Sequence, residues 1–316
     1  MNPHLIRMIA VDIDGTLLGE DGLVSARNRA ALQAAHAAGV EIVVATGRRH
    51  CYAMRVLRPL NLPPGILLVS SNGTVTRTVG SDTVPTRLIS RTHLQSRTAR
   101  WLLDHIEEFR DALVVTFDRV GPDGEDSAGA LVVEHLALLH ASIGRWMAAN
   151  EPYIAQIQPL EAALAAPHDQ PIQMMLCGTV DRMRRAEARL LAHPGVLGPG
   201  SVTTAAPAEI ALHRTQYPDR DLSILDILPA GCSKGVALLE IARARGLKAH
   251  QLLAIGDNWN DLPMFEAAGA AHVMGNAPEE LKALAGLRGW TIGVSNHQHG
   301  VAEAIETVLA AAPVLG

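Results

Sequence analysis

The sequence predicts an α/β protein in which a doubly wound parallel sheet is interrupted by an inserted α+β domain. Strand and helix patterns alternate near both ends of the chain, as parallel strands joined by crossover helices require. Between about Pro85 and Pro229 the alternation is lost and prolines are frequent. Because 316 residues exceed what one hydrophobic core comfortably supports, we expect a core formed by residues 1–84 and 230–316, and an inserted domain formed by residues 85–229.

The N-terminal elements follow the order strand, helix, strand. The apolar run Met8–Ile13 predicts a buried strand. Ser25 is a suitable N-cap for a helix over Ala26–Ala38, and Gly39 ends that helix. Two further apolar runs predict strands that close on polar segments: Val40–Ala45 before Thr46-Gly47-Arg48, and Ile66–Val69 before Ser70-Ser71-Asn72-Gly73.

The C-terminal region repeats this order. Ser233 is a suitable cap for a helix that ends near Gly246, and Leu252–Ile255 predicts a strand that closes on Gly256-Asp257. A short strand is expected at Ala271–Met274, with helices after it. Within the inserted domain the clearest patterns are a strand at Ile172–Cys177 and a helix at Asp181–Ala192.

Composition excludes several classes of protein. The formal net charge is -5 and the arginines are dispersed, so we do not expect a nucleic-acid partner. Cys51, Cys177 and Cys232 are widely spaced, which favours reduced thiols and disfavours a structural zinc site. There is no secretory pattern and no apolar stretch of the roughly 20 residues that a membrane helix needs. We therefore expect a cytoplasmic protein without membrane contact; the sequence does not predict its oligomeric state.

Two aspartates follow the first predicted strand with one residue between them. Side chains at positions i and i+2 of a strand project to the same side, so Asp12 and Asp14 are expected close enough for their charges to repel. Such a pair requires a positive partner.

Further polar residues are expected at the same edge of the sheet. In a doubly wound sheet ligands bind beyond the carboxyl ends of the strands, and these positions hold Thr46, Gly47, Asn72, Asp257, Asn260 and Asp261. Converging carboxylates favour a hard divalent cation, and Mg²⁺ suits a site that also accepts a phosphate oxygen. Phosphoryl transfer further requires a cation near the phosphate, for which Lys234 is the candidate.

Four motifs resemble those of the haloacid dehalogenase superfamily of phosphatases. In order along the chain they are Asp12-Ile13-Asp14-Gly15-Thr16, Ala45-Thr46-Gly47-Arg48, Ser233-Lys234-Gly235 and Gly256-Asp257-Asn258-Trp259-Asn260-Asp261. Ser71-Asn72-Gly73 and an insert between the second and third motifs resemble the Cof-type branch, subfamily IIB, which has a C2-type cap. The resemblance implies a Rossmann-like core with residues 85–229 as a cap that closes over the site.

The resemblance also implies a role for each motif residue. Asp12 would be the nucleophile and Asp14 the general acid and base, while Asp12, Asp257 and the backbone carbonyl of Asp14 would hold Mg²⁺. Thr46, Gly47, Asn72 and Asn260 would contact the phosphate, Lys234 would neutralise it, and Asp261 would orient Lys234 or a bound water. The expected reaction is hydrolysis of small phosphorylated metabolites, with sugar phosphates as the leading class, through an aspartyl-phosphate.

Several alternatives stay open. Phosphoryl transfer within a sugar, as in phosphomutases, and a phosphate-sensing module without turnover are alternative functions. Asp261 is equally suited to be the N-cap of the helix that follows it. The loop Asn296–Val301 has histidines where the family usually has acids; His297 and His299 are either a metal pair or, as favoured here, solvated surface.

Overall fold

The computed structural model describes residues 6–63, 65–81, 84–121, 124–139, 143–166, 169–198, 207–217 and 220–310. The chain forms two compact units. One contains the residues up to Ser90 together with those from Ser233 onward, and the other contains Arg91–Cys232. The first unit is therefore assembled from both ends of the chain, and we call it the core unit; the second is called the inserted unit.

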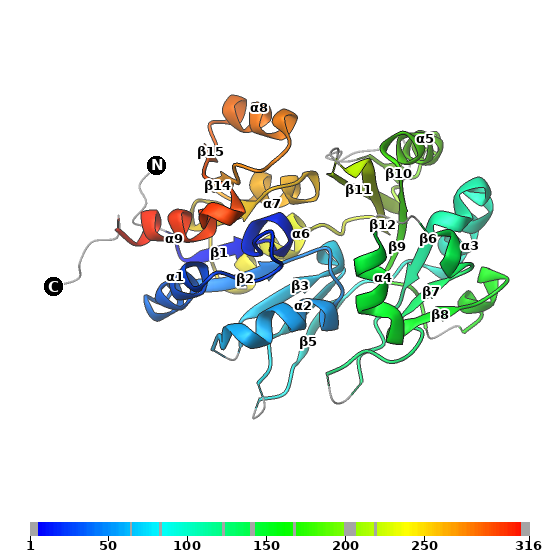
Figure 1. Cartoon of the computed structure of the whole chain (residues 1–316), viewed down its shortest axis with the longest axis horizontal. Coiled ribbons are helices and arrows are strands. Elements are labelled where there is room, and N and C mark those ends of the chain that lie inside the picture. The colour runs from blue at the N-terminus through cyan, green and yellow to red at the C-terminus, as the bar shows by residue number, and fades with distance from the viewer. Residues whose placement is uncertain are drawn as a thin grey trace. The chain divides into compact units, whose positions relative to one another are not determined.

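Among the described residues, eight strands form the sheet of the core unit (Figure 1). Neighbouring strands from β15 to β3 are parallel, and β4 pairs with β3 in the antiparallel sense. In spatial order the strands are β15 (Thr291–Ile292), β14 (Ala270–Val273), β13 (Leu252–Gly256), β1 (Met8–Val11), β2 (Glu41–Ala45), β3 (Leu67–Ser70), β4 (Val75–Thr78) and β5 (Leu88–Arg91). The chain runs outward from β1 in both directions, which confirms the doubly wound parallel sheet.

Helices cover both faces of this sheet because the buried strands are apolar on both sides. Ile9 and Val11 of β1 pack with α1, α2 and α9, whereas Met8 and Ala10 pack with α6, α7 and α8 on the opposite face. The helices on the first face are α1 (Ala26–Ala37), α2 (His50–Leu57) and α9 (Gly300–Ala310), and those on the second are α6 (Lys234–Ala244), α7 (Leu262–Ala267) and α8 (Glu279–Arg288). Ser25 caps α1 and Ser233 caps α6, as expected.

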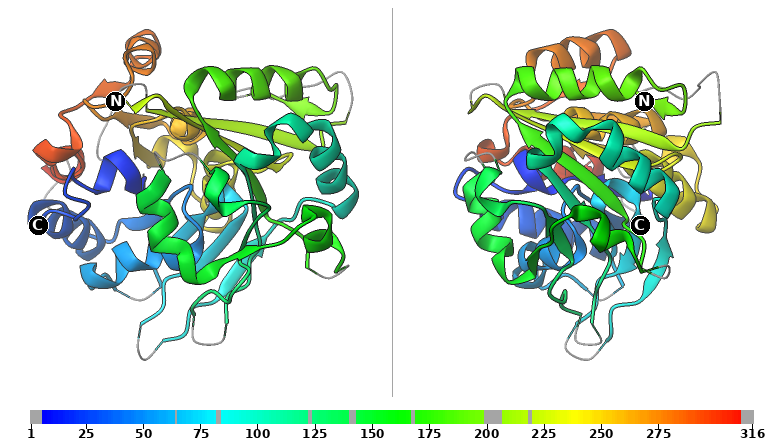
Figure 2. Two further views of the ribbon diagram at one scale, coloured as in Figure 1. Left: turned by 45° about the vertical axis from the view of Figure 1, so that its right-hand side comes forward. Right: turned by 90° about the vertical axis from the view of Figure 1, so that its right-hand side faces the viewer.

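The inserted unit has a second sheet, mostly antiparallel, in which seven strands are described. Figure 2 shows β11 and β12 side by side and next to α5. In spatial order the strands are β10 (Val196–Leu197), β11 (Ile210–Tyr217), β12 (Leu222–Pro229), β9 (Gln173–Gly178), β6 (Leu113–Thr116), β7 (Leu131–Val133) and β8 (Ile154–Gln156). The helices α3 (Ser96–His105) and α5 (Val180–Leu191) pack on one face of this sheet, and α4 spans Gly144–Asn150.

The expected strand Met8–Ile13 is too long. The strand β1 ends at Val11, and the chain then turns at Gly15, which has a φ of +75°. Asp14 therefore does not lie on a strand, and the expectation that Asp12 and Asp14 project from one strand face is wrong. The apolar character of Ile13 reflects burial beneath the turn and not membership of the strand.

Candidate active site

Strand register brings the predicted site residues to one edge of the core sheet. Val11 of β1 is level with Val44 of β2 and with Ile255 of β13, so the residues that follow these strands leave the sheet together. The backbone N–H of Asp12 donates to the carbonyl of Ile255 at 3.0 Å. The point between β1 and β13 is where the strand order reverses, which is the usual position of a ligand site in such sheets.

Lys234 joins two carboxylates from different parts of the chain. Its Nζ donates to Oδ1 of Asp12 and to Oδ1 of Asp261, each at 2.6 Å. Neither the lysine nor Asp261 is exposed, and Asp12 is 4% exposed. Asp257 completes the group: ligand atoms of Asp12, Asp257 and Asp261 all lie within 4.8 Å of one another. We call these four residues the acidic cluster.

The acidic cluster carries more negative charge than its lysine balances. Burial raises the pKa of Asp12 to about 7, aided by the charges of Asp261 and Asp14 and opposed by Lys234. Burial and the two neighbouring carboxylates raise the pKa of Asp257 well above its usual range. Burial alone lowers the pKa of Lys234, but the carboxylates outweigh it and the pKa is raised. Three buried carboxylates facing one ammonium form a set of hard oxygen donors that fits a divalent cation.

Asp261 uses both its oxygens within the protein. Oδ1 accepts from Lys234, while Oδ2 accepts from the backbone N–H of Asp257 at 2.9 Å and of Asn258 at 3.0 Å. Asp261 occupies the N-cap position of α7, as one alternative expected, but its side chain makes no capping hydrogen bond to that helix. Since Asp261 is occupied in this way, Asp12 and Asp257 are the carboxylates best placed for a cation.

Asp14 has a cation of its own. Nε and Nη2 of Arg48 donate to its two carboxylate oxygens at 2.7 and 2.6 Å, and the guanidinium lies 4.3 Å from the ring centroid of Tyr52. The Asp14 side chain is 43% exposed, whereas that of Asp12 is 5% exposed. The two aspartates of the first motif are therefore in different environments, one buried against a lysine and one at the surface against an arginine.

The uncharged residues form a second group beside the carboxylates. Asn260 donates from Nδ2 to Oδ1 of Asn72 at 3.2 Å, and the backbone N–H of Asn72 donates to the carbonyl of Thr46 at 3.0 Å. A Cβ on Gly47 would lie 3.2 Å from Nδ2 of Asn72, so the absence of a side chain lets the two loops approach. The hydroxyl of Thr46 accepts from the backbone N–H of Arg48 at 3.1 Å.

Three supporting residues were not assigned a role from the sequence. Thr16 donates to Oδ1 of Asp257 at 2.9 Å, Arg48 holds Asp14, and Asn276 donates from Nδ2 to the carbonyl of Gly15 at 2.8 Å. Thr16 and Arg48 stand inside the recognised motifs, and Asn276 comes shortly after β14. Asn276 could therefore have been selected as a candidate site residue, because it follows the end of a strand as the other candidates do.

The C-terminal histidines belong to no metal cluster that the described residues form. His297 is exposed, with Nδ1 3.0 Å from the hydroxyl of Ser295 and 3.7 Å from a carboxylate oxygen of Glu20. In the described part of the chain, the acidic cluster supplies the only group of three or more His, Cys, Asp or Glu side chains suited to a metal. Cys51, Cys177 and Cys232 are buried, and none of them forms a disulfide with another described cysteine.

A family comparison decides the identity of the fold. The sequence profile of the haloacid dehalogenase-like hydrolase family matches residues 9–124 and 204–305, which include all four motifs. The chain belongs to this family. The resemblance recognised from the motifs is confirmed, and the chain is accordingly an enzyme of the phosphatase class. No described helix is long and apolar enough to cross a membrane.

Individual relatives are similar to this protein over almost the whole chain. The 5-amino-6-(5-phospho-D-ribitylamino)uracil phosphatase YwtE of Bacillus subtilis is 28% identical, and the match covers 96% of this chain and 98% of the relative. A haloacid dehalogenase-like hydrolase from B. subtilis has a similar structure, with a TM-score of 0.73, 23% identity and coverage of 95% and 99%. A solved sugar phosphatase of subclass IIB gives a TM-score of 0.67 at 19% identity, with coverage of 95% and 98%.

Proposed function

We propose that this family member hydrolyses phosphomonoesters of small metabolites in a Mg²⁺-dependent reaction, through an aspartyl-phosphate on Asp12. The observation that carries the proposal is the acidic cluster, in which Lys234 bonds Asp12 and Asp261 while Asp257 lies beside them. A buried carboxylate at a strand end, next to a fixed ammonium, is suited to attack a phosphorus atom whose oxygens the ammonium neutralises.

Asp12 and Asp257 would hold the cation, with the backbone carbonyl of Asp14 as a further oxygen ligand. Bound Mg²⁺ would neutralise the charge of the phosphoryl oxygens and keep Asp12 ionised. Thr16 and Gly15 determine the position and the accessibility of the Asp257 carboxylate. The hydroxyl of Thr16 fixes one oxygen of Asp257, and a Cβ on Gly15 would lie 2.2 Å from the other, so only glycine leaves that oxygen accessible.

In the first step a carboxylate oxygen of Asp12 bonds to phosphorus and the ester P–O bond breaks. Lys234 stays within reach of the transferring group, and Thr46, Gly47, Asn72 and Asn260 surround its remaining oxygens. Asp14 gives a proton to the leaving oxygen. Since Arg48 holds Asp14 as a carboxylate, this ion pair opens and Asp14 takes up a proton from water before it acts as the acid.

In the second step water attacks phosphorus and the bond to Asp12 breaks. Asp14 now accepts the proton from that water, so the same side chain acts as an acid and then as a base. Inorganic phosphate leaves and the Asp12 carboxylate is restored.

Sugar phosphates are the proposed substrate class. The relative YwtE acts, by its name, on a phosphorylated ribityl compound, and a structural neighbour is described as a sugar phosphatase. Both substrates are small phosphate monoesters that bear hydroxyl groups. A panel of phosphorylated sugars and sugar alcohols, ranked by kcat/KM, will identify the members that this chain prefers.

The test is steady-state hydrolysis of p-nitrophenyl phosphate. We expect turnover with Mg²⁺, none after chelation, and none in Asp12→Asn; Glu20→Gln, an exposed carboxylate on the following turn, is the matched control and should match the wild type. Turnover that survives in Asp12→Asn contradicts the nucleophile. With a hexose 1-phosphate, release of inorganic phosphate over many turnovers supports a hydrolase, whereas an isomer without phosphate favours a mutase, and a single turnover favours a sensing module.

A further inference from the structure

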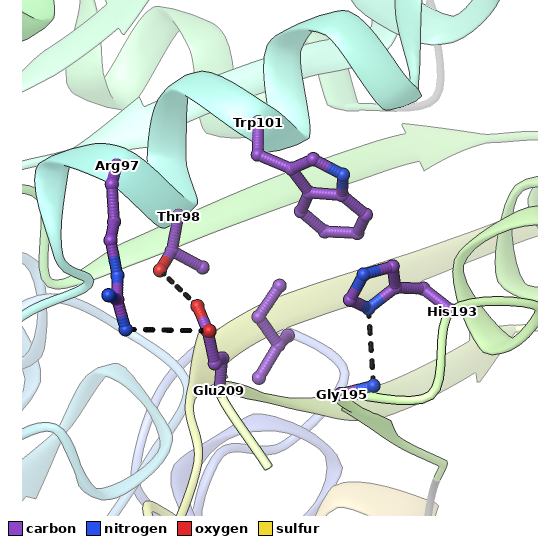
Figure 3. A pocket seen from close by; sticks show the side chains of 7 residues that line it. Arg97, Thr98, Trp101, His193, Gly195 and Glu209 are labelled. Atoms are coloured by element: carbon purple, nitrogen blue, oxygen red, sulfur yellow. Dashed lines mark hydrogen bonds and ion pairs between the residues drawn. The ribbon is translucent and has the colours of Figure 1, made fainter. Parts of the chain in front are cut away.

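The inserted unit contains a cavity that the proposed reaction does not use. Its volume is about 280 Å³, and it is lined by the first turns of α3, by the segment after α5 and by the start of β11. Figure 3 shows Trp101 and His193 on one side and Arg97 with Glu209 on the other. All its lining residues lie within Arg91–Cys232, so none of them belongs to the acidic cluster or to the unit that carries it.

One wall of the cavity is aromatic. The indole of Trp101 is stacked on His105, with ring centroids 4.6 Å apart, and the ring of His193 is tilted against it at 4.4 Å. Ile210, which is almost fully buried, adds an apolar surface. Indole rings bind other flat π systems, nucleobases among them, by stacking.

The opposite wall ends in a fixed carboxylate. Glu209 accepts a hydrogen bond from the hydroxyl of Thr98 at 2.6 Å and a weaker one from Arg97 at 3.5 Å. Its backbone N–H donates to the carbonyl of Gly195 at 2.9 Å, which fixes the residue at the start of β11. A carboxylate has about four acceptor positions. With its side chain 45% exposed, Glu209 retains acceptor capacity towards the cavity.

His193 supplies a donor. The backbone N–H of Gly195 donates to its Nδ1 at 3.2 Å, so Nδ1 carries no hydrogen and the neutral ring is protonated on Nε2. The cavity therefore combines a stacking face, a carboxylate acceptor and one N–H donor. A small aliphatic anion matches none of these groups except Arg97, and it would face the negative charge of Glu209.

We propose that this cavity is an accessory binding site for a small amino-substituted heteroaromatic ring of the nucleobase class. The ring stacks on Trp101, its amino group donates to Glu209, and a ring nitrogen accepts from Nε2 of His193. The site goes beyond the phosphatase reaction, and its test does not depend on that reaction.

The probe is 2-aminopurine, whose fluorescence is quenched when it stacks on an aromatic side chain. Titration of the full chain should give saturable quenching with one site per chain. Trp101→Leu and Glu209→Gln should each weaken binding at least tenfold, whereas Trp101→Phe should stay within about threefold of the wild type. Asp181→Asn removes an exposed carboxylate of the same unit outside the cavity and is the matched control.

Three results would overturn the proposal. Quenching that does not saturate, or that is unchanged in Trp101→Leu, excludes stacking on Trp101. Purine, which lacks the amino group, should compete at least tenfold more weakly; equal competition excludes the role of Glu209. Displacement of 2-aminopurine by putrescine excludes the heteroaromatic class. Circular dichroism verifies the fold of each variant, and Glu209→Gln, which alters an exposed side chain, keeps the test decisive should Trp101→Leu fail to fold.

Discussion

Lys234 places a positive charge at the N-terminus of a helix, which is unfavourable, yet its side chain is stabilised there by other residues. It is the first residue of α6, where the helix dipole disfavours a positive charge by about 0.3–1 kcal/mol. Two carboxylates at 2.6 Å offset this effect and the much larger desolvation of a fully buried ammonium. The partners that stabilise the ammonium at this position are the carboxylates of Asp12 and Asp261.

Replacing Asp14 by asparagine should affect the reaction differently from replacing Asp12. Asp14→Asn keeps Asp12, the proposed nucleophile, but loses the side chain proposed as the proton donor and as the base that activates water. Hydrolysis should fall by about 10²–10⁴-fold. Because the loss of the base affects dephosphorylation, the variant should accumulate a phosphorylated chain, detectable by intact-protein mass spectrometry after brief incubation with substrate. A chain that stays unmodified while hydrolysis is lost would contradict this division of roles.

At residue level the sequence predicted the members of the site better than their contacts. Asp12, Lys234, Asp257 and Asp261 could be selected because each follows a strand or starts a helix. The pairing of Asp14 with Arg48 was not predicted, because it depends on the turn at Gly15 that redirects Asp14 away from the strand direction. Contacts between two loops are set by their backbone conformations, which strand periodicity does not encode.

At the level of elements, α6 and α7 pack closely because Gly235 has no side chain. A Cβ on Gly235 would lie 2.0 Å from the carbonyl oxygen of Pro263, so Gly235→Ala should force the helices apart and reduce the free energy of unfolding by about 1–3 kcal/mol. Gly286 is the matched control: it lies in α8 with nothing within 4 Å of the added Cβ. Gly286→Ala should be stabilising by about 0.5–1 kcal/mol. Urea denaturation of both variants distinguishes them, and equal changes would contradict the close contact.

The strand β14 carries a buried histidine with a pH consequence. Nε2 of His272 has no hydrogen-bond partner among the described residues, and the ring lies against Gly293. Burial lowers the pKa of His272, with a smaller opposing effect from Glu303. The unfolded chain therefore binds a proton at this position at higher pH than the folded chain does, so stability falls as the pH drops below about 6.5.

The measurement is the thermal midpoint between pH 7.5 and pH 5.5. His272→Leu removes the titrating group while keeping an apolar side chain, and its midpoint should decrease less over this range than that of the wild type. Other histidines titrate equally in both proteins, so the difference isolates His272. Parallel profiles would show that His272 is protonated as easily in the folded chain as in the unfolded one.

The accuracy with which elements could be predicted differs between the two units. The strands β2 and β13 and the caps Ser25 and Ser233 lie close to the expected positions, because parallel strands are continuous apolar runs bounded by turn residues. In the inserted unit, β9 and α5 were expected, but β6 to β8 were not. Short strands that pair across a mostly antiparallel sheet are specified by partners distant in sequence, and their own pattern is weak.

On the scale of the whole molecule, Mg²⁺ should stabilise the fold as well as support activity. A ligand that binds only the folded state adds about 2.7 kcal/mol at a concentration one hundred times its Kd. We expect the thermal midpoint to rise with Mg²⁺ concentration. Asp257→Asn should reduce this rise, and it should also be more stable than the wild type in a chelator because it removes a buried carboxylate of raised pKa. KCl at matched ionic strength is the control, and an undiminished rise in Asp257→Asn would contradict the assignment.

The two-unit organisation of the whole chain could be inferred from where the alternation of strands and helices stops. Along the chain, the boundaries between the units fall between Ser90 and Arg91 and between Cys232 and Ser233. The expected boundaries were at 84/85 and 229/230. Assignment of the inserted unit as a cap and of the protein to the cytoplasm stays a prediction. Neither property follows from a local sequence pattern. A cap is defined by movement of the inserted unit over the site, and the location of the protein is determined by the cell.

The pairing of β1 with β13 has a consequence for biosynthesis. Lys234 is 222 positions after Asp12, and β13 is later still, so a ribosome has released most of the chain before β1 acquires its second neighbour. Until then the nascent N-terminal segment presents an open apolar strand edge, the kind of surface that chaperones bind and that promotes misassembly. The acidic cluster, where we propose that the reaction takes place, is thus among the last parts of this enzyme to form during translation.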